Sequence, residues 1–354
     1  MMIVDGLKFH NIDFIAHHKG IEGGLLERVP ETLGKHLSKA GQIMMICPSG
    51  SEIRFVSDTY PVRIALSVDK IADRIGEGAG HSEAQIFFGT FQSRQRFVIN
   101  RDKTTVDIVM PHENFMTMAE KVAKDSSFSP HVCRVRFWGR TMGAPIRFHH
   151  LKSKGRLRPP RPEEVPKYTY LAYGSSLTQG AYASGPHLTY TSQVGARLGV
   201  DVINLGTSCS AYCEPEMADY IAERKDWDFA TLALSVNMVD LFSPEQFFER
   251  VSYMIRRIAE SDPKRPVVCI TIKTYYGDFL EGNRPDVYRT LLRKAVEEAS
   301  LENVFLMEGP DLMPDIAGGL GPDLIHLGDF GMVQIGENLA KKLQPILKAY
   351  DLLP

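Results

Sequence analysis

The sequence predicts two domains of different class: an all-β sandwich of the jelly-roll type at 1–151 and a doubly wound α/β domain at 168–354. Three observations lead to this prediction. The chain has 354 residues, more than a typical single domain. Short apolar runs alternate with turn residues before position 150, whereas strand and helix patterns alternate after position 168. A basic, proline-rich stretch at 152–167 separates the two patterns.

The N-terminal half consists mainly of short runs rich in β-branched and aromatic residues. Runs with the length and composition of strands lie at 52–58, 62–68, 84–91, 95–100, 105–111, 133–139 and 145–151. Such spacing is typical of sandwiches and jelly rolls. Only 31–40 and 113–124 have a helical pattern. No catalytic set stands out in this half, and its two histidine pairs fit solvated or core positions better than a metal site.

The stretch at 152–167, KSKGRLRPPRPEEVPK, is predicted to be a stiff linker. Its four prolines restrict the backbone and cannot join a central strand. We expect such a linker to hold the N-terminal domain in a fixed place, near the mouth of the site, where it would limit the size of the substrate. A role in stability or oligomerisation is the alternative.

The C-terminal half alternates strand and helix patterns. The predicted strands lie at 168–174, 201–206, 229–236, 266–272 and 303–308, and the predicted helices at 189–199, 215–225, 244–261, 284–300 and 329–349. Runs such as TLALSV and VVCITI are apolar throughout, which is typical of parallel strands covered on both faces. We therefore expect a doubly wound parallel sheet, which binds its ligands at the carboxyl ends of the strands.

Two short motifs point to a catalytic site at that edge. The first predicted strand stops at Gly174-Ser175-Ser176, which places a serine in a tight turn at the end of a buried strand. Near the C-terminus, GPDLIHLGDFG places Asp323 three residues before His326, close enough for the two side chains to meet. An imidazole held by a carboxylate is the arrangement that activates a serine hydroxyl as a nucleophile.

Two more strand ends complete a pattern. Gly206 follows VINL, and Asn237 follows TLALSV. In order with the serine and the Asp-x-x-His pair, they resemble the sequence blocks of the SGNH (GDSL-type) hydrolases. Ser175 stands where that family has the aspartate of G-D-S-x-T, and Met238 where it has the aspartate of G-x-N-D, whereas D-x-x-H matches fully. The resemblance covers roughly residues 168–345 and implies a flavodoxin-like sheet of five strands.

The resemblance also implies a role for each matched position. Ser176 would be the nucleophile, His326 the general base and then acid, and Asp323 the carboxylate that orients the imidazole. The oxyanion hole would consist of the Ser176 amide, the Gly206 amide and the Asn237 side chain. One such donor stabilises a transition state by about 3 kcal/mol.

Each of these residues also has an ordinary structural explanation. A serine pair after a strand often caps a helix. Gly206 and Asn237 are common turn residues, and Asp323 after Gly-Pro can start a turn. Ser175 is a competing nucleophile, although the G-x-S-x-T register favours Ser176. His187, Tyr190 and Tyr275 are expected to line the substrate pocket, with packing or surface roles as the alternative.

The predicted function is a serine esterase or acylhydrolase that removes a short, acetyl-like acyl group from a sugar or another small hydroxylated compound. The layout resembles carbohydrate-esterase-like members of the family with a jelly roll in front of the catalytic domain, which is an analogy at the level of the fold. An acyltransferase on the same machinery and a non-catalytic sugar-binding protein are the alternatives. A nucleotide-binding flavodoxin-like protein is disfavoured, because GSSLTQG lacks a phosphate-loop lysine.

Composition limits the partners. A net charge of -2 gives no electrostatic reason to expect nucleic acid or an anionic membrane, and no apolar run is long enough to span a bilayer. The N-terminus lacks a secretory pattern, so a cytoplasmic location is expected, with five reduced cysteines. Cys209 and Cys213 are close enough for a metal site, but no second pair matches them. We expect no metal and no cofactor, and the oligomeric state stays open.

Overall fold

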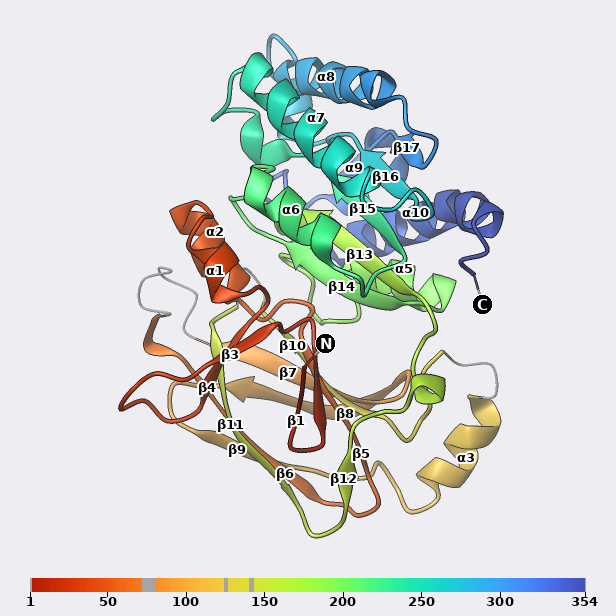
Figure 1. Cartoon of the computed structure of the whole chain (residues 1–354). Coiled ribbons are helices and arrows are strands. Elements are labelled where there is room, and N and C mark those ends of the chain that lie inside the picture. Colours follow the sequence, from red (N-terminus) through yellow and green to blue (C-terminus); the bar gives the residue numbers. More distant parts are fainter. Residues whose placement is uncertain (1, 72–80, 124–126, 140–142, 354) are drawn as a thin grey trace. The chain divides into compact units, whose positions relative to one another are not determined.

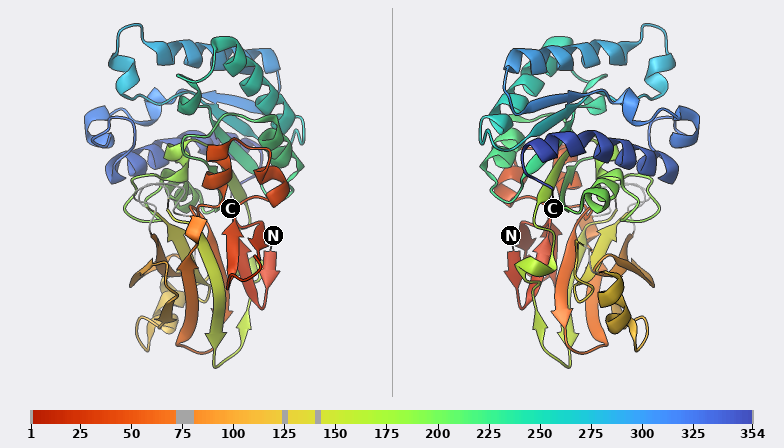
Figure 2. Two further views of the ribbon diagram at one scale, coloured as in Figure 1. Left: turned by 90° about the vertical axis from the view of Figure 1, so that its left-hand side faces the viewer. Right: turned by 90° about the vertical axis from the view of Figure 1, so that its right-hand side faces the viewer.

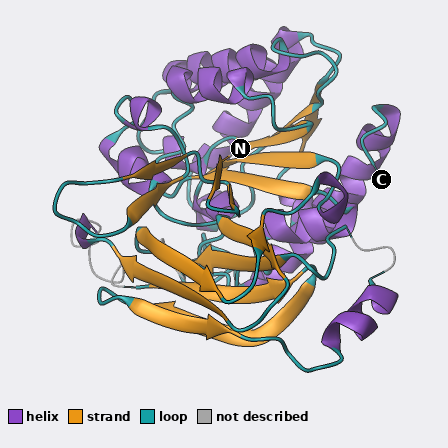
Figure 3. Cartoon of the chain, turned by 60° about the horizontal axis from the view of Figure 1, so that its bottom comes forward, coloured by secondary structure: helices purple, strands orange, loops and turns teal. Residues whose placement is uncertain are grey.

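The computed structural model describes residues 2–71, 81–123, 127–139 and 143–353. The chain divides into two compact units (Figure 1). The first contains Met1–Glu31 and Met45–Lys167, and the second contains Thr32–Met44 and Tyr168–Pro354. Strands dominate the first unit and helices are concentrated in the second (Figure 3).

Two antiparallel sheets build the first unit. One has the order β1 (Met2–Val4), β2 (Leu7–His10), β5 (Glu52–Ser57), β10 (Cys133–Trp138), β7 (Ser82–Phe88) and β8 (Phe91–Ile99), with β12 (Leu157–Arg158) also paired to β5. The other has the order β3 (Phe14–Ala16), β4 (Gly24–Glu27), β11 (Ile146–Ser153), β6 (Val62–Val68) and β9 (Thr104–Ile108). Helix α3 (Phe115–Val122) is the predicted helix at 113–124, whose last residue lies outside the described part.

One apolar core joins the two sheets of this unit. Ile53 and Phe55 on β5 and Ile64 and Leu66 on β6 are all fully buried in it. On β5 these residues alternate with polar ones, which gives the strand one inward face, as expected for packed antiparallel sheets. The predicted antiparallel β region is therefore confirmed, while the jelly-roll topology stays a prediction.

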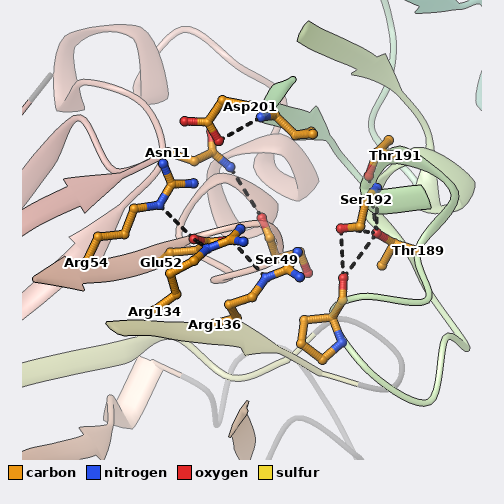
Figure 4. A network of polar contacts seen from close by, with 12 residues as sticks. Asn11, Ser49, Glu52, Arg54, Arg134, Arg136, Thr189, Thr191, Ser192 and Asp201 are labelled. Carbon is orange, nitrogen blue, oxygen red and sulfur yellow. Dashed lines mark hydrogen bonds and ion pairs between the residues drawn. The ribbon is translucent and has the colours of Figure 1, made fainter. Parts of the chain in front are cut away.

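A buried ionic cluster lies on the other face of β5 (Figure 4). The Glu52 carboxylate accepts hydrogen bonds from Arg54 at 2.7 Å and from Arg134 at 2.7 and 2.8 Å. Burial alone would raise the pKa of Glu52, but Arg134, Arg54 and Arg136 hold it well below its usual range. A carboxylate buried among so many guanidinium groups stays charged, because its partners replace the water it has lost.

The units differ from the predicted domains in two places. Residues 152–167 belong to the first unit: β11 extends to Ser153, and β12 pairs with β5. Arg158 also forms two hydrogen bonds of 2.6 Å with Glu164, so this stretch is folded and does not act as a linker. The predicted helix at 31–40 is two short helices, α1 (Glu31–Gly34) and α2 (Lys39–Met45), and Thr32–Met44 groups with the second unit.

A five-stranded parallel sheet forms the centre of the second unit. Its order is β14 (Asp201–Gly206), β13 (Thr169–Gly174), β15 (Phe229–Ala233), β16 (Val267–Ile270) and β17 (Val304–Met307). The first strand along the chain, β13, lies second in the sheet, which is the flavodoxin-like order 2-1-3-4-5. The predicted fold class is thus confirmed. The order reverses around β13, which makes the carboxyl ends of β13 to β15 the expected ligand site.

Helices cover both faces of this sheet (Figures 1 and 2). Helices α5 (Tyr190–Leu198) and α10 (Asp329–Ala349) share a core with β13, β15 and β16. Helices α6 (Pro215–Glu223), α7 (Pro244–Ala259) and α8 (Arg284–Ala299) pack in sequence on the other face. Each predicted helix of this half is present with small shifts at its ends. Among the described residues, none of the helices is long and apolar enough to cross a membrane.

Candidate active site

The chain turns sharply at the end of β13. Gly174 is the last residue of the strand, and the one-turn helix α4 (Ser176–Gln179) follows after Ser175. A β-carbon on Gly174 would lie 2.3 Å from Thr178 Oγ1, so only glycine allows α4 to fold back this closely. Gly180 ends the helix with a φ of 96°. The turn thereby places Ser176 at the carboxyl end of the central strand.

A tight loop presents the Asp-x-x-His pair. Leu320 and Leu327 form a bridge across its base, and the Gly321 amide donates to the His326 carbonyl at 2.6 Å. Asp323 Oδ1 accepts the His326 amide at 2.9 Å, so the aspartate fixes the backbone of the loop as well as the imidazole. The Asp-Leu-Ile-His spacing is what makes this double contact possible.

Ser176, His326 and Asp323 form one hydrogen-bonded chain. His326 Nδ1 lies 2.7 Å from Asp323 Oδ2, and His326 Nε2 lies 2.8 Å from Ser176 Oγ. With the Nδ1 proton donated to the carboxylate, Nε2 is left to accept the serine proton. Burial would raise the pKa of Asp323, but the hydrogen bonds from the His326 side chain and from backbone amides lower it, so the carboxylate stays charged.

Ser175 takes a different position from its neighbour. It is 4% exposed and lines a small cavity, whereas the His326 imidazole forms its hydrogen bond with Ser176. The geometry therefore favours Ser176 as the nucleophile. Within the described residues, the Ser176 amide has no acceptor, which leaves it available to a substrate oxygen.

Asn237 lies in the short helix Val236–Met238 that follows β15. Its Oδ1 accepts the Ala211 amide at 3.2 Å, and Ser235 Oγ donates to the Ala211 carbonyl at 2.5 Å. The hydrogen bond from the Ala211 amide fixes the orientation of the Asn237 side chain, because it occupies Oδ1 and leaves the NH2 group as a donor.

Gly206 does not offer the amide that the family resemblance implied. Its N–H donates to Asn204 Oδ1 at 2.8 Å, and a β-carbon on it would lie 2.1 Å from the Gln179 amide nitrogen. Gly206 therefore allows β14 to approach α4. In the loop that follows it, the amides of Cys209 and Ser210 have no acceptor within the described chain, and Cys209 has a φ of 52°.

Sequence reasoning missed Asn204. Its Nδ2 donates to the Thr178 carbonyl at 2.8 Å and to Thr191 Oγ1 at 3.2 Å, while its Oδ1 holds Gly206. One side chain thus ties β14 to both α4 and α5. An asparagine inside the apolar run VINLG was the available signal, since a buried amide needs several partners.

The three predicted pocket residues have different environments. Tyr190 is fully buried at the start of α5, with its hydroxyl 2.7 Å from Thr178 Oγ1, so it cannot contact a substrate as predicted. His187 is partly buried, and its carbonyl accepts from Gln193 at 2.6 Å. Tyr275 lines the same small cavity as Ser175.

Tyr182 is a further neighbour of the site. Its ring lies edge-on to the His326 ring with centroids 4.9 Å apart, and 41% of the residue is exposed. The Asp323 charge raises the pKa of its hydroxyl, which therefore stays neutral beside the carboxylate. Its φ of 68° is rare for a tyrosine, and nothing in the sequence marks it.

The cysteine pair considered as a metal site is not assembled as one. Cys213 is buried and Cys209 is exposed, and the Cys213 amide donates to the Tyr173 hydroxyl at 3.0 Å. The described residues contain no group of three or more His, Cys, Asp or Glu side chains placed to hold a metal ion.

Comparison with known proteins places the C-terminal half of the chain in a family. The model of the GDSL-like lipase/acylhydrolase family matches residues 168–345, which is half of the chain. The chain belongs to this family. No curated protein matches the sequence. The family assignment confirms the SGNH resemblance, whose blocks fall within the matched residues.

Solved structures with two similar units share the fold. The salicylyl-acyltransferase SsfX3 from a tetracycline biosynthetic pathway has a TM-score of 0.76 at 16% identity, over 96% of this chain and 95% of that chain. A putative GDSL-like lipase from Bacteroides ovatus has a TM-score of 0.68 at 17% identity, over 93% of this chain and 92% of that chain. A family two carbohydrate esterase from Clostridium thermocellum, in complex with cellohexaose, has a TM-score of 0.60 at 15% identity, over 85% of this chain and 93% of that chain.

Proposed function

We propose that this GDSL-family protein is a serine esterase that removes a short acyl group from a sugar or another small hydroxylated compound. The observation that carries the proposal is the unbroken hydrogen-bonded chain from Ser176 through His326 to Asp323. Three side chains from two distant parts of the sequence meet in the order that nucleophilic acyl transfer requires.

The reaction follows from these contacts. Ser176 Oγ attacks the ester carbonyl carbon while its proton moves to His326 Nε2, and the carbonyl electrons move onto the oxygen. The tetrahedral intermediate then collapses, and the leaving alkoxide takes the proton back from Nε2. A water molecule, deprotonated by the same nitrogen, attacks the acyl-serine and releases the acid. Asp323 holds the imidazole and stabilises its charged form during both acylation and deacylation.

The oxyanion would be bound by the free Ser176 amide and by the NH2 group of Asn237. Both are donors with no net charge, and the hydrogen bond from Ala211 sets the orientation of the second before substrate arrives. Such preorganised donors stabilise the transition state because they need no reorganisation during the reaction.

Two features of the structural neighbours bear on the substrate. Esterases named for carbohydrates share both units, which supports a sugar ester. The match to the salicylyl-acyltransferase covers 96% of the chain, and it supports the second candidate function, transfer of the acyl group to an alcohol in place of water. A non-catalytic sugar-binding role is opposed by the assembled serine, histidine and aspartate.

A nucleophile experiment tests the proposal. Ser176→Ala should lower the hydrolysis of 4-nitrophenyl acetate by on the order of a thousandfold or more, because Ser176 carries the one hydroxyl among the described residues that contacts His326 Nε2. Ser175→Ala is the matched control and should keep a measurable fraction of the activity. Peptide mass spectrometry after treatment with a serine-reactive phosphonate should place the adduct on Ser176. An adduct on Ser175, or full activity in Ser176→Ala, would refute the assignment.

Adding alcohol acceptors to the same assay separates transfer of the acyl group from hydrolysis.

A further inference from the structure

Lys273 is a buried lysine whose charge is not used by the esterase chemistry above. It lies just beyond the end of β16 and is 5% exposed. No carboxylate pairs with it in the described parts of the chain. Its Nζ lies over the Tyr190 ring, 5.1 Å from the ring centroid. Lysine is rarely buried without a counter-charge, because removing an ammonium from water costs several kcal/mol.

The charged groups around Lys273 are engaged with one another. Arg289 donates to the Ile272 and Lys273 carbonyls while it pairs with Asp278. Glu308 pairs with Arg293 and accepts the Thr271 hydroxyl. Neither acid contacts the Lys273 ammonium, so within the described residues the Tyr190 ring is what faces its charge. Burial accordingly lowers the pKa of Lys273 to about 8.

A small cavity is lined by Lys273 and by chain neighbours of Ser176 and His326. Lys273 lines it together with Ser175 and Leu177, which flank the nucleophile, and with Ile325 and Leu327, which flank the histidine. Its volume is about 20 Å³. That is enough for a water-sized polar group and too small for a long alkyl chain. A small anionic group in this cavity would supply the counter-charge that Lys273 lacks.

We propose that Lys273 determines substrate specificity by binding the negatively charged end of a short acyl group, such as the free carboxylate of a dicarboxylic half-acyl group. The inference rests on the proposed esterase function and narrows its substrate class. The cavity suits the acyl group better than the alcohol, because the alcohol must leave past His326, where the half-exposed Tyr182 marks the solvent side. The carboxylate would pair with the ammonium inside a site of low polarity, where such a pair is strong.

Two ethyl esters that differ at one end test this inference. Monoethyl succinate carries a carboxylate where ethyl butyrate carries a methyl group, and ethanol release measures both. We expect the full-length protein to show a kcat/KM for monoethyl succinate about tenfold or more above that for ethyl butyrate. In Lys273→Met that ratio should fall at least about tenfold, through KM for monoethyl succinate, with kcat for ethyl butyrate changed less than about threefold. Lys294→Met, on the exposed side of α8, is the matched control and should keep the ratio.

The wild-type protein provides a second measurement that needs no variant. Because Lys273 loses its proton above a pH of about 8, the preference for the anionic ester should decline between pH 7 and pH 9.5. His326 and Asp323 act on both esters alike, so their contribution cancels in the ratio. The neighbouring Tyr190 stays neutral, since burial raises its pKa.

The outcomes separate the two proposals. Equal or greater activity on ethyl butyrate, or an unchanged ratio in Lys273→Met, overturns the role of Lys273 even if Ser176 is labelled by the phosphonate. An absence of both ester turnover and phosphonate labelling overturns the esterase function, and the substrate class with it.

Discussion

At the scale of single residues, Asn237 shows how one contact can prepare a side chain for catalysis. Asn237→Ala should lower kcat by about a hundredfold or more with little change in KM, because the NH2 group acts mainly on the charge that develops in the transition state. Steady-state kinetics on 4-nitrophenyl acetate measure both constants. Asn237→Asp is the sharper variant: it keeps an oxygen for the Ala211 amide but removes the donor, so its kcat should fall at least as far. A defect confined to KM would show that Asn237 binds the substrate instead.

The site residues that the sequence predicts are those whose chemistry depends on short spacings along the chain. Ser176 stands at a strand end, and Asp323 and His326 stand three apart, so the sequence alone brings them to one edge of the sheet. Gly206 was misassigned because a glycine after a strand looks the same whether its amide is free or held by an asparagine two positions earlier. The sequence does not indicate that Lys273 is buried, because a lysine after an apolar strand is normally exposed.

At the scale of elements, Asn204 joins the strand β14 to the nucleophile's helix. Asn204→Ala leaves the Gly206 amide and the Thr178 carbonyl without their partner, which should cost about 1–3 kcal/mol of stability. Since α4 carries Ser176, kcat should fall as well, by on the order of tenfold or more. Urea unfolding and ester hydrolysis measure the two effects.

Asn303 provides the matched control for that prediction. It is also a buried asparagine, and its Nδ2 donates to the carbonyls of Ala259, Asp262 and Arg265, away from α4. Asn303→Ala should therefore lose similar stability and keep kcat. Equal losses of kcat in both variants would mean that Asn204 acts through general stability alone.

Elements were predictable where burial on two faces made the pattern long and uniform. The five parallel strands and their helices are of this kind, because the strands are mostly apolar and the helices are amphipathic. The strands β1 to β4 have only three or four residues each, too few for a period to show. The β12 strand lies beside a proline-rich stretch, and what holds it is pairing with β5, about 100 residues earlier, which is not local in the sequence.

At the scale of the whole molecule, each unit has its own core and its own tryptophan. Trp138 lies in the first unit and Trp227 in the second, and both are buried. Trp227→Phe and Trp138→Phe therefore leave one fluorescent reporter for each unit. In these backgrounds, Ile64→Ala should shift the Trp138 transition in urea, and Leu339→Ala the Trp227 transition, each by about 2–5 kcal/mol. Identical shifts of both reporters by either variant would show that the units unfold as one.

The grouping of Thr32–Met44 with the second unit bears on how the gene can be rearranged. These residues leave the ribosome long before Tyr168, so they wait for the rest of their unit while the intervening chain is made. A single crossover after Lys167 would give the catalytic half a new neighbour but would also take this segment away from it. Recombination between members of the family would therefore have to carry two separate pieces of coding sequence together, and a transplanted catalytic half would need its own copy of the early segment.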